Sequence, residues 1–210
     1  MDFTLEDILH TIGQALMNPC LVVLFLLMAV AVWQVGDLLV ELLVERRKYR
    51  VKVPELMQAL HAGGKEHLAK QIEASGLLRG QKDILLSMIQ ADNLPKESLV
   101  ALAQSQLATA ERRCEKTVAV TNLVAKLGPM FGLLGTLIPL GPGIVALGQG
   151  DTTTLSSSLA VAFDTTIAGL ISAAVASVIS NIRNRWYHDD MVILETLMEA
   201  TLQEVIEDAE

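Results

Sequence analysis

The sequence has little charge and few aromatic residues for a chain of 210 residues. Charged residues make up 19% and aromatic residues 4% of it, whereas soluble proteins average about 25% charged residues. The net charge is −8, from 16 Lys and Arg against 24 Asp and Glu. Nucleic-acid-binding proteins need a basic surface and often stacking rings, so this composition argues against that class. Two cysteines cannot form a disulfide framework either.

Catalytic and metal-binding motifs are also missing. The sequence has no G-x-x-x-x-G-K-[ST] nucleotide loop and no G-x-S-x-G nucleophile motif. The four histidines are scattered, and none forms an i,i+4 pair with a second ligand type on a spanning helix; they are His10, His61, His67 and His188. Cys20 and Cys114 are expected to be packed thiols. We therefore expect no catalytic residue, no metal site, no cofactor and no enzymatic activity.

Apolar residues are what the chain has in excess. They make up 51% of it, and the mean hydropathy is +0.43. Charge-free segments run over 8–36 and 127–150, and a third segment, 155–182, contains the single charge of Asp164. Because about 20 apolar residues cross a bilayer core of about 30 Å, the sequence predicts three transmembrane helices, roughly at 17–40, 126–147 and 154–182. The first lacks the basic flank of a signal peptide, so we expect it to be a span.

The basic residues predict the orientation in the membrane. Fourteen of the sixteen lie between Arg46 and Lys126, and the other two, Arg183 and Arg185, follow the third span. The positive-inside rule places both regions in the cytoplasm and the N-terminus outside. The predicted protein is an all-α, multi-pass protein of the cell's inner (cytoplasmic) membrane. We divide it into 1–44 (outer end and first span), 45–125 (cytoplasmic helices), 126–182 (a hairpin of two spans) and 183–210 (an acidic cytoplasmic helix).

The cytoplasmic parts read as helices throughout. Glycine and proline positions predict helices at Pro54–Leu60, Lys65–Ala74 and Gln81–Ala91, with Asn93 and Pro95 opening a long helix over Lys96–Lys126 that leads straight into the second span. The first span is expected to continue as a stalk past Asp37, Glu41 and Glu45. Apolar stripes recur at helical spacing along the long helix (Leu99, Leu102, Leu107, Ala110, Val118) and the tail (Met191, Leu194, Leu197, Met198, Leu202, Val205). Packing is the simplest interpretation of these stripes.

The second and third spans each carry a face of small residues. In the second, Gly128, Gly132, Thr136, Pro139 and Gly143 recur at spacings of three and four; in the third, Ser158, Ala162, Thr166, Gly169, Ala173, Ala176 and Ser180 do so. Small faces allow close helix contact in lipid. We expect packing for Gly128, Gly132, Gly135, Gly169 and Ala173.

The hydroxyls of Thr136, Thr165 and Thr166 and the carboxyl of Asp164 favour more than packing, because an ionisable group at membrane depth marks a functional site by default. At about 100° per residue, Asp164 lies about 160° from Thr166 around the helix. The two side chains therefore cannot face the same axis in a regular helix. Either Asp164 faces a neighbouring helix or subunit, or the helix is locally irregular.

Two motifs resemble the MotA/TolQ/ExbB proton-channel family. They are GLLGT, from Gly132 to Thr136, and TTIAGL, from Thr165 to Leu170, joined by a short outer loop. TolQ and ExbB proteins read GLFGT at the first motif and T-A-x-G-L in the last span. The predicted layout of three spans with a large cytoplasmic insert after the first is also similar to that family. The specific motifs cover about 128–183, and the layout covers most of the chain.

The resemblance implies an ion-channel stator subunit, a transporter that converts ion-motive force into movement. In the family, five copies surround a dimer of a small single-span partner of the ExbD, TolR or MotB type, whose aspartate binds the ion. By position, Thr136 and Thr166 would line the pore beside that aspartate, with Thr165 and Asp164 nearby in the ion pathway. The partner's identity, the driven process and the choice between proton and sodium stay open.

Two positions depart from the family pattern. ExbB-like proteins have a glutamate five residues before the second threonine, where this chain has Val161; Asp164 is a possible substitute. Pro139 and Pro142 remove helical hydrogen bonds and are expected to kink or loosen the outer half of the second span. The alternative function is a pentameric membrane scaffold without ion flux. A membrane enzyme using Asp164 is a third possibility, which the lack of a second nearby acid or base disfavours.

Overall fold

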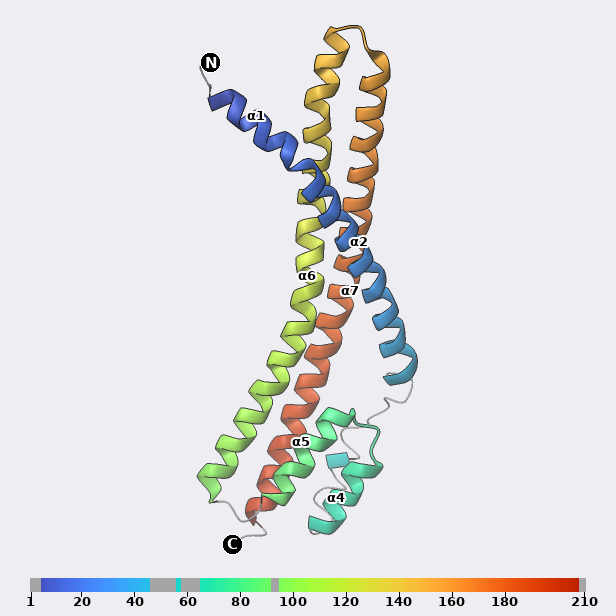
Figure 1. The fold of residues 1–210 in the computed structure, drawn as a ribbon. Helices are drawn as coiled ribbons and strands as arrows, with labels where there is room; N and C mark the ends of the chain where they lie inside the picture. The colour runs from blue at the N-terminus through green and yellow to red at the C-terminus, as the bar shows by residue number, and fades with distance from the viewer. Residues whose placement is uncertain (1–4, 46–55, 58–64, 92–94, 208–210) are drawn as a thin grey trace. The chain divides into compact units, whose positions relative to one another are not determined.

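The computed structural model describes residues 5–45, 56–57, 65–91 and 95–207 (Figure 1). All regular elements within these ranges are helices: α1 Leu5–Ala15, α2 Met17–Val40, the π-helix η1 Glu41–Glu45, α4 Lys65–Ala74, α5 Arg79–Gln90, α6 Lys96–Gly148 and α7 Thr152–Glu207. Three apolar stretches, within 11–43, 96–148 and 152–206, are long enough to cross a membrane. The predicted all-α membrane fold with three spans is confirmed.

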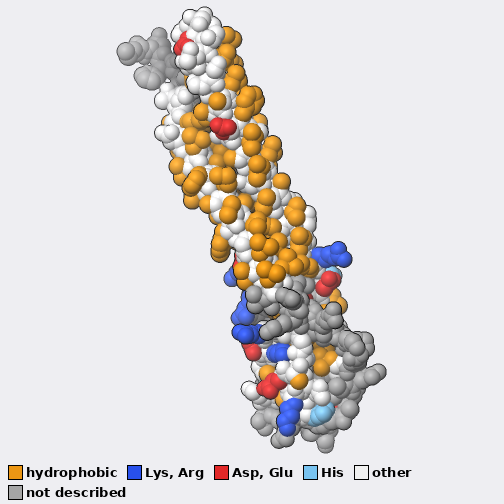
Figure 2. Space-filling view, turned by 90° about the vertical axis from the view of Figure 1, so that its right-hand side faces the viewer, with side chains coloured by type: hydrophobic (Ala, Val, Ile, Leu, Met, Phe, Trp, Pro, Cys, Tyr) orange, Lys and Arg blue, Asp and Glu red, His pale blue; other side chains and the backbone are white. Residues whose placement is uncertain are grey.

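The chain divides into two compact units. Unit 1 comprises the described residues up to Leu38 and Val118–Ile182, and unit 2 comprises those of Leu39–Thr117 and Arg183–Glu210. Helices α6 and α7 contribute residues to both. Figure 2 shows that hydrophobic side chains cover most of one face of the spanning helices, where no Lys or Arg side chain interrupts them. Lipid is the solvent that such a surface fits.

A tight turn joins α6 to α7 in unit 1. Gly150 adopts φ +80°, and its N–H donates to the Leu147 carbonyl (3.0 Å) while the Asp151 N–H donates to the Ala146 carbonyl (2.9 Å). This is a Schellman ending, which requires a left-handed residue and so favours glycine at that position. Asp151 then caps α7: its Oδ1 accepts from the N–H groups of Thr153 (3.1 Å) and Thr154 (3.0 Å). The two caps allow the chain to reverse within a few residues.

Helix α2 packs against this hairpin through an apolar cluster. Leu27 and Ala31 of α2 meet Val124 of α6 and Ala176 of α7 in the core of unit 1. On the same side of α6, the Cys20 thiol donates to the Phe131 carbonyl (3.4 Å). The expected packed thiol is therefore found at Cys20, and the three spans form one three-helix bundle.

Unit 2 is built around its own apolar core. Leu68 and Ile72 of α4, Leu85 and Met88 of α5, and Leu99 of α6 are buried in it. The tail stripe of α7 completes the core with Leu194, Leu197, Met198 and Val205 buried and Met191 and Leu202 partly buried. The tail stripe therefore packs as expected, and of the predicted stripe on the long helix Leu99, Leu107 and Ala110 join this core.

Most predicted helix bounds agree with the structure. Helix α4 covers the predicted range, and α6 runs unbroken from Lys96 through the second span. Helix α5 begins at Arg79, two residues before the predicted start. The reason is that the Gln81 side chain accepts a hydrogen bond from the Leu78 N–H (3.2 Å), which caps an earlier first turn. Of the predicted helix over 54–60, only 56–57 are described, and these are helical; the Asn93 cap lies outside the described residues.

Two features of the spanning helices were not anticipated in this form. The stalk after the first span is helical to Glu45, as predicted, but its last five residues form a π-helix. Helix α6 also continues through Pro139 and Pro142 to Gly148. The lost hydrogen bonds at these prolines therefore do not interrupt the helix, and the kink or loosening expected there stays a prediction.

Candidate functional site

The hairpin of α6 and α7 is held by backbone-to-backbone contact between small residues. A Cβ added to Gly128 would lie 2.6 Å from the Gly169 carbonyl oxygen, and one added to Gly169 would lie 2.5 Å from the Gly128 carbonyl oxygen. Ala173 also contacts this point, 3.0 Å from the added Gly128 Cβ. No side chain fits at either glycine without separating the helices. The small-residue faces thus allow the two spans to touch along their backbones.

One turn further along, Thr165 fills the space that Gly135 leaves. Its Cβ and Oγ1 would lie 2.6 and 2.7 Å from a Cβ added at Gly135, and Thr165 is only 5% exposed. The hydroxyl donates within its own helix, toward the carbonyls of Val161 and Ala162 (both 2.9 Å). Gly132 completes this contact, since its added Cβ would lie 3.5 Å from the Thr165 carbonyl oxygen. Of the predicted polar residues, Thr165 is therefore the one placed inside the hairpin.

Thr136 and Thr166 lie at the same level as this contact but on its edge. Both are half-buried. The Thr136 hydroxyl donates to the Leu133 carbonyl (2.6 Å), and the Thr166 hydroxyl donates to the Ala162 carbonyl (3.0 Å). Each hydroxyl thus donates its hydrogen bond to a carbonyl of its own helix, and its oxygen can still accept a hydrogen bond from another group.

The phases of the helices place both threonines on one side of the hairpin. At about 100° per residue, Thr136 and Thr166 are each offset by about 60–70° from the glycine contact face of their own helix, in the same rotational sense. Because α6 and α7 run in opposite directions, equal offsets of the same sense point to the same edge of the pair. The structure therefore brings the two predicted pore residues together.

Helix α2 occupies the opposite edge. The α6 side chains in its apolar cluster are Val124, Ala125, Leu127 and Phe131. All of these except Ala125 lie on the other side of the glycine face from Thr136 by the same count of about 100° per residue. The hairpin thus has one edge covered by an apolar spanning helix and one edge carrying two hydroxyls. That asymmetry is the main geometric feature of unit 1.

Asp164 points to neither edge and is exposed. It lies on the outer face of α7, where Phe163, Ile167 and Ile171 are 64%, 55% and 57% exposed. Its face is therefore apolar apart from this carboxyl. Charged side chains in spanning helices face other protein or water-filled cavities rather than lipid, because lipid cannot solvate them. Of the predicted site residues, Asp164 is the one that the structure separates from the threonines.

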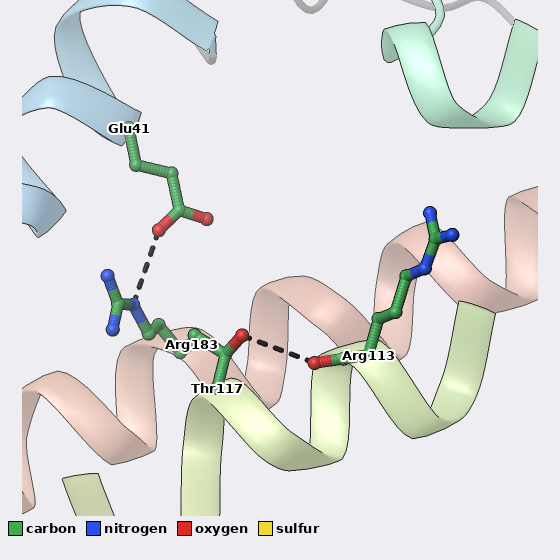
Figure 3. Close-up of polar contacts among 4 residues, drawn as sticks. All are labelled: Glu41, Arg113, Thr117 and Arg183. Atoms are coloured by element: carbon green, nitrogen blue, oxygen red, sulfur yellow. Dashed lines mark hydrogen bonds and ion pairs between the residues drawn. The ribbon is translucent and has the colours of Figure 1, made fainter. Parts of the chain in front are cut away.

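Unit 2 contains a largely buried ion pair that no sequence pattern predicted (Figure 3). The Arg183 Nε lies 3.3 Å from the Glu41 Oε2, with the side chains 3% and 14% exposed. Nearby on α6, the Thr117 hydroxyl donates to the Arg113 carbonyl (3.2 Å). The partners of the ion pair are 142 positions apart in the chain, so no local pattern could pair them. The π-helix η1 begins at Glu41, so the ion pair with Arg183 lies where the wider π-helical turn starts.

The same part of unit 2 contains Cys114. Burial raises the pKa of the Cys114 thiol, and the carboxylates of Asp190 and Glu41 raise it further. A thiol so placed is protonated at neutral pH and is a poor nucleophile. Among the described residues, no group of three His, Cys, Asp or Glu side chains is arranged to hold a metal ion. These observations give Cys114 a packing role.

Comparisons with known proteins match the region that contains these features. A model of the MotA/TolQ/ExbB proton channel family matches residues 68–196, more than half of the chain. Motility protein A of Aquifex aeolicus (strain VF5) is 30% identical over 156 residues. That match covers 69% of this chain and 60% of the relative, so the chain spans less than two thirds of that relative's length. Gly128, Thr136, Asp164 and Thr166 all lie within the matched region.

Proposed function

The chain belongs to the MotA/TolQ/ExbB proton channel family, and we propose that it is the ion-channel subunit of an energy-transducing stator in the inner membrane. In this proposal the N-terminus lies outside and the C-terminus in the cytoplasm. Five copies surround a dimer of a small single-span protein of the ExbD, TolR or MotB type. The proton-motive force moves that partner relative to the ring. The protein is a transporter subunit and not an enzyme.

The observation that carries the proposal is the asymmetry of the hairpin. Helix α2 covers one edge with apolar side chains, and the other edge carries the hydroxyls of Thr136 and Thr166. In a ring of copies, the apolar edge suits lipid and the hydroxyl edge suits a polar central path. Acceptor oxygens on that edge can order water or a hydrated ion beside the partner's carboxyl group.

The remaining two flanks of the hairpin would then meet neighbouring copies. One flank is the outer face of α7 with Asp164, and the other is the exposed apolar face of α6 with Leu133 and Leu137. Contact with a neighbouring copy removes Asp164 from lipid, as is required because a carboxyl group at membrane depth must face protein or water. We therefore assign Asp164 to the contact between copies, Thr165 to the hairpin interior, and Thr136 and Thr166 to the pore.

Native mass spectrometry of the detergent-purified particle tests the assembly. The product of the neighbouring gene should be co-expressed, since a single-span partner is expected there. Five chains of 22.7 kDa give five times 22.7, or 113.5 kDa, and two partner copies add to this mass. A particle of 113.5 kDa or of that mass plus two partner copies supports the ring. A monomer or dimer contradicts it, because no central pore would exist.

The alternative function is a pentameric scaffold that carries no ions. It gives the same particle mass, so the two candidates differ only in ion movement. Proton flux into vesicles, measured with a pH-sensitive dye under an imposed potential, separates them. Flux that depends on the Thr136 and Thr166 edge supports the channel, whereas a ring without flux in the presence of its partner supports the scaffold.

A further inference from the structure

Helix α1 has an apolar face that no other part of the described chain covers. Leu5, Ile8, Ile12 and Leu16 follow one another at spacings of three and four residues, so they form a single stripe along the helix. These side chains are 79%, 45%, 50% and 49% exposed. Thr11 lies on the flank of the helix, about 100° from the centre of this stripe, and Gln14 lies on the opposite side. A continuous exposed stripe of this kind marks a binding surface.

The helix is interrupted between α1 and the first spanning helix, α2. Only Leu16 separates α1 from α2, and Pro19 has no N–H to donate to the Ala15 carbonyl four residues before it. Helix α2 alone has 24 residues, about 36 Å at 1.5 Å per residue. It therefore crosses a hydrocarbon core of about 30 Å without help from α1.

We propose that α1 lies in the headgroup layer of the bilayer, with its stripe of Leu5, Ile8, Ile12 and Leu16 in the acyl chains. The stripe is continuous with the membrane surface of α2, where Val22 and Phe25 are exposed only two turns after Leu16. Such helices bury their apolar face by about 5–10 Å at the boundary between headgroups and acyl chains. In the proposed orientation this is the outer leaflet, although the lipid contact itself does not depend on which leaflet it is.

The charges of α1 determine which lipids it needs. Interfacial helices usually bind anionic lipids through Lys and Arg, but the first basic residue of this chain is Arg46. The attachment therefore rests on burial of apolar side chains, and it should be as strong on zwitterionic phosphatidylcholine as on membranes that contain phosphatidylglycerol.

Spin-label accessibility on the full chain tests this directly. In a Cys20→Ala, Cys114→Ala background, single cysteines replace Ile8 and Ile12 on the stripe and, as controls, Thr11 on the flank and Gln14 on the opposite side. The labelled protein is reconstituted in phosphatidylcholine vesicles. Collision rates of each nitroxide are then measured with oxygen, which concentrates in lipid, and with a nickel chelate, which stays in water. Circular dichroism and particle mass confirm that each variant retains its fold and assembly.

We expect the oxygen-to-nickel ratio to be several-fold higher at Ile8 and Ile12 than at Thr11 and Gln14. The pattern should persist when phosphatidylglycerol is added. High nickel collision rates at all four positions would overturn the proposal, because the stripe would then lie in water. Low rates with both reagents at Ile8 and Ile12 would also overturn it, because a second copy or another protein would then cover the stripe. Loss of the pattern on pure phosphatidylcholine would contradict its apolar basis.

A pair of further substitutions distinguishes the orientation of α1 from a local effect of the spin label. With the label at Ile12, Ile8→Ser should lower the oxygen-to-nickel ratio, since it removes apolar area from the stripe. Gln14→Ser, on the opposite side, should leave the ratio unchanged. Equal effects of the two substitutions would contradict an oriented helix.

Discussion

Gly169 lies so close to Gly128 that a Cβ at Gly169 would stand 2.5 Å from the Gly128 carbonyl oxygen. Both partners are backbone atoms, so neither can move aside as a flexible side chain would. The contact fixes the distance between the two spans and, through it, the position of the edge that carries Thr136 and Thr166. Disturbing it should therefore affect the whole hairpin.

Gly169→Ala should destabilise the protein by about 1–3 kcal/mol or more, the usual cost of overpacking. Gly141 is the control: it lies on α6, the other helix of the hairpin, and a Cβ there would have nothing within 4 Å. Gly141→Ala should be neutral or slightly stabilising, because alanine favours helix. Thermal unfolding in detergent measures both variants. Equal stability of the two variants would show that the hairpin tolerates separation.

Removing one partner of the Arg183–Glu41 ion pair should be costly. Arg183→Ala removes the guanidinium that lies 3.3 Å from the Glu41 carboxylate, and removing one partner of a buried ion pair typically costs about 3–5 kcal/mol. The exposed Arg185, two residues further along α7, provides the control, since Arg185→Ala should change stability by less than about 0.5 kcal/mol. Unfolding of each variant is measured under the same conditions. A double variant, Arg183→Met with Glu41→Leu, should recover much of the loss. Its failure to do so would mean that the ion pair is not the cause.

Much of the fold follows from the sequence because its signals are local. Charge-free runs predicted the three spans, and the glycines after Ala74 and before Lys65 gave α4 its bounds. The start of α5 was missed because its cap is made by Gln81, a residue without a strong capping signal of its own. Local sequence patterns predict the presence of a helix more accurately than they predict the residue at which it begins.

The arrangement of the candidate site needed the structure. The small-residue pattern indicated that the second and third spans touch, but it could not say which of the adjacent residues Thr165 and Thr166 points between them. That depends on the rotation of α7 about its axis, which the Gly135 contact determines. The Arg183–Glu41 pair was beyond sequence reasoning because it joins segments 142 positions apart.

The cap of α7 should make stability depend on pH at low pH. Hydrogen bonds from the Thr154 side chain and from the backbone of Thr154 and Thr153 lower the pKa of Asp151. The pKa of Asp151 in the folded state thus lies below its pKa in the unfolded state. The contribution of Asp151 to the free energy of unfolding is therefore complete above the unfolded-state pKa and is lost as pH falls through the folded-state pKa. The difference in unfolding temperature between wild type and Asp151→Ala should be constant above about pH 5 and shrink below about pH 4. A difference independent of pH would contradict a charged cap.

The Cys114 thiol should react slowly. Because burial and the Asp190 and Glu41 carboxylates raise its pKa, its thiolate fraction at pH 8 is smaller than that of a free cysteine with a pKa of about 8.5. Iodoacetamide should therefore alkylate the Cys114 thiol more slowly than it alkylates the thiol of glutathione. Asp190→Asn should increase the alkylation rate of Cys114. Peptide mass spectrometry separates Cys114 from Cys20. Alkylation of Cys114 as fast as that of glutathione would contradict this placement.

In the proposed function, the edge carrying Thr136 and Thr166 lines an ion path. Proton flux into vesicles that contain the ring and its partner tests this path by comparing Thr166→Leu with Thr166→Ser. Thr166→Leu should abolish flux with an unchanged particle mass, because an apolar side chain removes the acceptor oxygen, and Thr166→Ser should retain flux. Undiminished flux with Thr166→Leu would contradict a pore at this edge. Loss of assembly with Thr166→Leu would also contradict it, because Thr166 would then serve packing instead.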